Sequence, residues 1–155
     1  DYEERVRLGV GAKTLSENTD VVLVFNHEGM RMARTKAGNL TLSEDSTGLH
    51  VHAPSLNGAQ ALVRDVISGI QEGVLDEMSF AFRVTRQEWS PAWMQRDIVE
   101  YSLHRGDVSV VTYGANPFTS VEAAARSAAP DSSTRGLSLS LAMAETAYLR
   151  SAVIL

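Results

Sequence analysis

The chain has 155 residues, which is enough for one domain and too few for two ordinary ones. Of these residues 44% are hydrophobic and 21% charged, a composition typical of globular proteins. It has no cysteine, which excludes disulfides, thiolate metal sites and a cysteine nucleophile, and no apolar run is long enough for a membrane-spanning helix. Without such a run we expect no membrane location. The formal net charge is −5 with the 14 basic residues scattered, so we also expect no nucleic-acid partner.

Short apolar runs bounded by turn residues predict strands in the first third of the chain. We expect these strands at residues 5–13, 21–25, 40–42 and 49–52. The polar residues between the last two are turn formers, which predicts a hairpin.

A helix is predicted next, over residues 57–73, because apolar side chains recur there at spacings of three and four. Asn57 is the expected N-cap and Gly73 the expected stop.

Strict alternation marks the segment after this helix as a strand. Met78 and Phe80 alternate with Ser79, which places the serine on the face opposite the large apolar side chains. A loop at 89–93 then leads to two expected strands, at 98–103 and 108–113.

The C-terminal part of the chain changes in composition. Residues 119–128 are alanine-rich and predict a helix, whereas residues 130–136 have the composition of a linker. We therefore expect one domain over residues 1–129, followed by the linker and a helical tail over 137–155 that docks on the domain or on a partner.

Three candidate catalytic residues lie on or next to the apolar strands: His27, Ser79 and Asp107. A serine hydroxyl becomes a good nucleophile when an imidazole takes its proton and a carboxylate orients that imidazole. Residue types alone do not establish this role, because most strand serines face solvent and most single histidines are structural.

Two other groups of polar residues have weaker chemical meaning. His50 and His52 would share one side of a strand, but no third ligand at a telling spacing accompanies them, so a solvated hairpin face is the better interpretation. Asp76 and Glu77 are adjacent and would point to opposite faces, which argues against paired acid–base work.

The order of these segments over residues 20–120 resembles the prohead proteases of tailed bacteriophages, a family distantly akin to the herpesvirus maturation proteases. The matching segments are Asn26-His27-Glu28, then Gly38-Asn39-Leu40-Thr41-Leu42 with Asp45 and Gly48-Leu49, the helix at 57–73, Met78-Ser79-Phe80-Ala81-Phe82, and Asp107-Val108-Ser109-Val110-Val111-Thr112-Tyr113-Gly114-Ala115-Asn116-Pro117.

The resemblance implies a mainly β domain with flanking helices and a closed, herpesvirus-protease-like β-barrel. It implies a serine endopeptidase that cleaves capsid or scaffold precursors, with Ser79 as nucleophile, His27 as base and Asp107 as the orienting acid. His104 is the rival third member, since the herpesvirus enzymes use a second histidine in that role. On one continuous strand it would face away from Asp107, unless Arg105-Gly106 breaks that strand. The resemblance also implies that the protein acts inside the assembling prohead in the host cytoplasm and needs no metal or cofactor. Self-cleavage and formation of a homo-oligomer are two further possibilities that the resemblance raises. By the same resemblance the backbone of residues 114–116 would bind the oxyanion.

The sequence departs from the family pattern at three positions. Asp107 stands where the family more often has glutamate, Ala81 replaces a glycine, and Gly114 replaces a proline. Two rival functions therefore stay open: a non-catalytic capsid-assembly or scaffold protein with the same barrel, and a peptide- or ligand-binding barrel with residues 89–93 as a lid.

Overall fold

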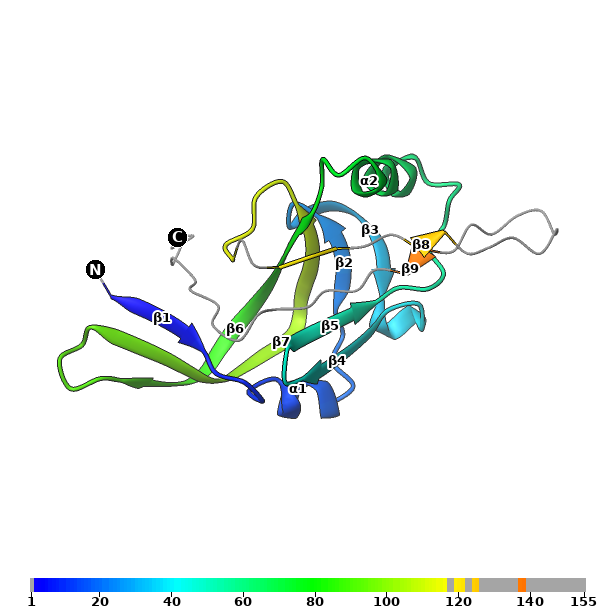
Figure 1. Ribbon diagram of the computed structural model, residues 1–155. Coiled ribbons are helices and arrows are strands. Elements are labelled where there is room, and N and C mark those ends of the chain that lie inside the picture. The colour runs from blue at the N-terminus through cyan, green and yellow to red at the C-terminus, as the bar shows by residue number, and fades with distance from the viewer. Residues whose placement is uncertain (1, 117–118, 122–123, 126–136, 139–155) are drawn as a thin grey trace.

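The computed structural model describes residues 2–116, 119–121, 124–125 and 137–138 (Figure 1). Its strands are β1 (Glu3–Val6), β2 (Val22–Phe25), β3 (Glu28–Arg34), β4 (Thr41–Asp45), β5 (Gly48–His52), β6 (Glu77–Trp89), β7 (Gln95–Val111), β8 (Ala124–Ala125) and β9 (Leu137–Ser138). Its helices are α1 (Ala12–Ser16), α2 (Ala61–Gln71) and the 3-10 helix η1 (Thr35–Ala37).

The main sheet is built around β7. Its strand order is β1-β7-β2-β3, with β6 also paired to β7. β1 and β2 run parallel to β7, whereas β6 runs antiparallel to it. The pairs β4-β5 and β8-β9 form separate two-stranded sheets. The mainly β prediction is confirmed, but no sheet in the described residues closes into a barrel, so the closed barrel is not confirmed.

β7 is one long bent strand, and the prediction of two strands at 98–103 and 108–113 is wrong in this respect. The bend lies at Arg105, whose φ is 62°, and Gly106. A Cβ at Gly106 would lie 2.2 Å from the carbonyl oxygen of Ala81, so only glycine lets β6 pass this closely. Before the bend β7 pairs with β1, and after it β7 pairs with β2. Figure 1 shows the end of β6 and the start of β7 projecting together as an arm, with β1 beside it.

One face of the sheet body carries the core. Met78 and Phe80 of β6 pair with Val110 and Val108 of β7, and all four side chains are buried. Helix α2 contributes three further buried apolar side chains, those of Val63, Val66 and Ile70. The alternation predicted around Ser79 is therefore confirmed, because its two neighbours face the core and Ser79 does not.

Helix α2 is shorter than predicted at its start. Its N-cap is Gln60 rather than Asn57, and the Asn57 side chain instead accepts a hydrogen bond from the Ala59 N–H within the preceding turn. The predicted stop agrees better, since Gly73 follows the C-cap with a φ of 73°.

Both ends of the chain differ from expectation. The first strand ends at Val6, because a turn at Gly9 with a φ of 78° leads into α1. Ala124–Ala125 and Leu137–Ser138 are strands, not parts of the expected helix and helical tail, because they pair with each other. The linker at 130–136 and the rest of the tail lie outside the described residues. No helix among the described residues is long and apolar enough to cross a membrane.

Candidate active site

His27 lies in a two-residue turn between β2 and β3. Asn26 and His27 have φ values of 50° and 61°, and Phe25 pairs with Glu28 across them. Two positive φ values in a two-residue loop define a type I′ turn, which matches the twist of a hairpin. Asparagine and histidine tolerate this left-handed region better than most residues do.

Asn26 ties this turn to β7. Its N–H donates to the Val110 carbonyl at 2.9 Å, and its side-chain oxygen accepts from the Thr112 N–H at 2.9 Å. The parallel pairing of β2 with β7 therefore continues past the end of β2. As a result His27 is held over the end of the strand that carries Asp107.

His27 and Asp107 form a hydrogen bond, with 2.7 Å between Nδ1 and Oδ1. The Asp107 side chain is 16% exposed and that of His27 is 39% exposed, so the acid lies deeper than the base. A carboxylate on Nδ1 fixes the ring and leaves Nε2 free to accept a proton. No other described residue is hydrogen-bonded to Nε2.

Ser79 lies on the same face of the sheet as Asp107. It pairs with Ser109 of β7, and the next pair on that face is Ala81 with Asp107. Directly opposite residues on neighbouring strands have Cβ atoms about 5 Å apart. Ser79 is half-buried, and within the described part of the chain its hydroxyl is not hydrogen-bonded to His27. The fold thus brings the three predicted residues to one region of one face, with only the His27–Asp107 contact closed.

Ser109 is a residue of this site that sequence reasoning missed. Its side chain is fully buried, and its hydroxyl oxygen accepts a hydrogen bond from the His27 N–H at 2.7 Å. One signal could have found it, because residues 107 and 109 share a face of any strand that contains both.

The rival third member lies elsewhere. His104 Nδ1 is 3.5 Å from the Asp20 N–H, on the far side of the bend in β7. Asp20 is also paired with the Arg34 guanidinium, whose hydrogen bonds hold the pKa of that carboxyl below its usual range. The structure therefore places Asp107, and not His104, against His27.

The backbone expected to bind an oxyanion lies next to β6. The Gly114 N–H donates to the Glu77 carboxylate at 2.5 Å, so this donor already has a partner. Glu77 is two residues before Ser79 and shares its face of the strand. The segment after β7 is thereby held close to Ser79.

The hairpin histidines show no metal-binding arrangement. His50 contacts Asp45 and Thr47. Hydrogen bonds to the Asp45 carboxylate, from the Thr47 hydroxyl first and from His50 second, hold the pKa of that carboxyl far below its usual range. In the described part of the chain no group of three or more histidine, aspartate or glutamate side chains could hold a metal ion.

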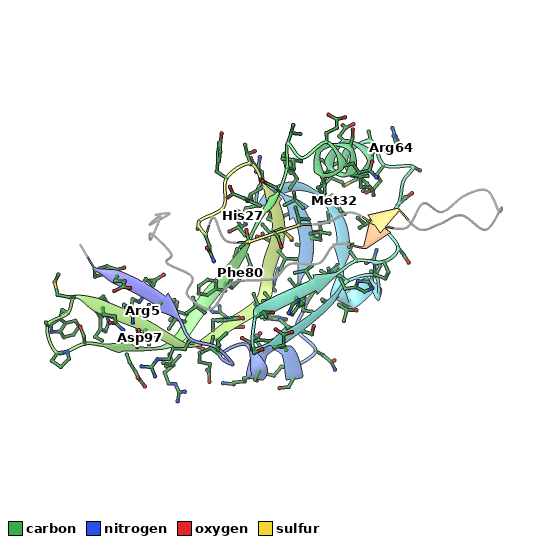
Figure 2. All side chains as sticks on the ribbon, viewed as in Figure 1. Arg5, His27, Met32, Arg64, Phe80 and Asp97 are labelled. Atoms are coloured by element: carbon green, nitrogen blue, oxygen red, sulfur yellow. The ribbon has the colours of Figure 1, made fainter. Side chains whose placement is uncertain are left out.

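Figure 2 shows His27 at one end of the sheet body, well separated from Arg5 and Asp97 on the arm. Neither the curated proteins nor the solved structures contain a match to this chain. One family model does match, over residues 1–133, and its description is caudovirus prohead serine protease. A match over most of the chain, together with a histidine–aspartate pair beside an outward-facing serine, leads to one conclusion: the chain belongs to the caudovirus prohead serine protease family.

Proposed function

We propose that this chain is a serine endopeptidase that cleaves capsid or scaffold precursors inside an assembling phage particle. Ser79 is the nucleophile, His27 the general base and Asp107 the residue that orients it. The observation that carries the proposal is the 2.7 Å contact between His27 Nδ1 and Asp107 Oδ1 on the face that presents Ser79. The family match supports the class of substrate.

Acylation begins at the Ser79 hydroxyl. Its oxygen attacks the carbonyl carbon of the scissile peptide bond while His27 Nε2 takes the proton. Asp107 stabilises the resulting imidazolium through Nδ1. The tetrahedral intermediate then collapses, the C–N bond breaks, and the leaving amine takes the proton from Nε2.

Deacylation repeats these transfers with water. His27 Nε2 accepts a proton from the water that attacks the ester carbonyl, and it returns this proton to Ser79 when the ester bond breaks. The Ser79 side chain needs to reach His27 only when substrate is present, since catalytic hydrogen bonds often tighten only in the substrate complex.

The test is labelling of the purified protein with a fluorophosphonate, which reacts with activated serines, and location of the adduct by mass spectrometry. We expect the adduct on Ser79, and its loss in Ser79→Ala and in His27→Ala. Ser102→Ala is the matched control. Ser102 lies on β7, but its hydroxyl accepts a hydrogen bond from the His104 N–H and contacts none of the three proposed catalytic residues. It should label like the wild type.

Absence of an adduct on Ser79, both alone and with the capsid precursor added, would overturn the proposal. That result would favour the non-catalytic scaffold role. A label on another serine would equally contradict the assignment of Ser79.

A further inference from the structure

The Ser109 hydroxyl of β7 hydrogen-bonds both the turn that carries the proposed base, His27, and the strand β2 that precedes this turn. It accepts the His27 N–H at 2.7 Å and donates to the Val24 carbonyl of β2 at 3.4 Å. The side chain has no exposed surface. A buried hydroxyl with both of its roles used in this way is a fixed part of the fold.

His27 is consequently attached to β7 at two points. Its backbone N–H meets Ser109, and its ring meets Asp107, two residues earlier on the same face. Those two β7 residues are about 7 Å apart along the strand. Ser109 holds the His27 main chain and Asp107 holds the His27 ring. Together the two contacts fix the orientation of the imidazole, with Nε2 turned away from Asp107.

The neighbouring contacts do not duplicate this one. Asn26 is held by Val110 and Thr112, and these contacts preserve the turn itself. Among the described residues, Ser109 is the only hydrogen-bond partner of the His27 main chain. Loss of the hydroxyl should therefore keep the turn in place and release the orientation of His27.

We propose that Ser109 is a positioning residue, which holds the His27 main chain so that the imidazole meets both Asp107 and the proton of Ser79. The proposal rests on the proposed protease function. Ser109 acts through His27 and takes no part in bond making. Its effect should thus fall on kcat and leave substrate binding nearly unchanged.

The experiment compares Ser109→Ala with Ser102→Ala on the same strand. For Ser109→Ala we expect kcat to fall about 10- to 100-fold while KM changes less than about threefold, since a misplaced catalytic group typically costs this much. In protein labelled with 15N-histidine, we expect the downfield NMR signal of the His27 Nδ1–H to be lost in Ser109→Ala, and we expect the same loss in Asp107→Asn. Ser102→Ala should change neither readout.

Retention of both kcat and the Nδ1–H signal in a folded Ser109→Ala protein would overturn the inference. If that variant does not fold, Ser109→Cys gives the same two readouts, because sulfur fills similar space but accepts hydrogen bonds only weakly. Failure of the protease function is distinguishable: the wild type would then show no Ser79 adduct, while the NMR signal would still depend on Ser109.

Discussion

The hydroxyl of Thr119 hydrogen-bonds both the N–H and the carbonyl of Met78, at 2.9 and 3.0 Å. Both residues are buried, so these backbone groups of β6 have lost contact with water and depend on the hydroxyl. The backbone N–H and carbonyl of Met78 point away from β7. Backbone groups of successive strand residues point to opposite sides, so those of Ser79 point toward Ser109 of β7. Thr119 therefore stabilises the strand next to the proposed nucleophile.

Replacement of Thr119 by valine should destabilise the fold. The isosteric change leaves the Met78 N–H and carbonyl buried without a partner, which should lower the free energy of unfolding by about 1–3 kcal/mol. Urea denaturation followed by circular dichroism measures this. Thr41→Val, at an exposed position of β4, is the control and should stay within about 0.5 kcal/mol of the wild type. Equal losses in the two variants would contradict the role of the buried hydroxyl.

Changes at Asp107 should separate charge from reach. Asp107→Asn keeps the shape but loses the charge that stabilises the imidazolium, so we expect kcat to fall about 10²- to 10⁴-fold. Asp107→Glu keeps the carboxylate on a longer arm and should lose only about tenfold. Steady-state cleavage of a capsid-precursor peptide measures both. An Asn variant as active as the Glu variant would exclude Asp107 as the orienting acid.

Gly106→Ala should be among the most damaging single changes in the sheet. The new Cβ would lie 2.2 Å from the backbone oxygen of Ala81. Because this oxygen belongs to the backbone of β6, the clash is relieved only if β6 and β7 separate. We expect a loss of about 3 kcal/mol or more in the free energy of unfolding.

Gly69→Ala is the matched comparison for that variant. Its Cβ would lie 2.7 Å from Leu75 Cδ1, the end of a side chain that can rotate away, and alanine favours the helix. A loss under about 1 kcal/mol is expected, and urea unfolding of the two variants decides the matter.

Stability should fall in acid because of the Asp20–Arg34 pair. Hydrogen bonds from Arg34 hold the pKa of Asp20 below its ordinary value of 3.8. A carboxyl with a lowered pKa in the folded state stabilises the fold fully above its unfolded pKa, and this contribution is lost as the pH falls below that value. The urea midpoint should therefore drop on acidification below about pH 4.

Asp20→Asn should show a smaller acid-dependent drop than the wild type, since it has lost this titrating group. Asp65→Asn is the control, because Asp65 is exposed on α2 and forms no ion pair among the described residues. If the urea midpoint of Asp20→Asn fell with pH as steeply as that of the wild type, the Asp20–Arg34 ion pair would not contribute to the acid dependence of stability.

Local patterns predicted much of the fold around the site. Alternation in residues 78–84 correctly set Ser79 apart from the core, and the turn formers at 43–48 correctly predicted the β4–β5 hairpin. The turn itself is shorter than predicted, because the strands extend to Asp45 and begin again at Gly48. Both features depend on neighbours in the sequence, and period and turn chemistry report such neighbours well.

Long-range features were beyond those patterns. The contact of His27 with Ser109 joins residues 82 apart, and nothing in either segment specifies the other. The sequence predicts two strands where the fold has the single strand β7. Arg105 and Gly106, between the two predicted strands, form a bend in β7 at its change of partner strands. Spacing alone does not assign His27, Ser79 and Asp107 to one site, whereas the resemblance to the prohead proteases does.

The parallel pairing of β2 with β7 has a consequence for synthesis of the chain. His27 and Asp107 are separated by 80 residues, so the proposed base meets this carboxylate only after β7 has left the ribosome and docked. Pairings of such long sequence separation form late, because loop-closure entropy has to be overcome first. A nascent or truncated chain that ends before β7 would therefore carry His27 and Ser79 without Asp107. Under the proposed mechanism such a chain would lack its orienting acid, so the order of folding would delay proteolysis until β7 has docked.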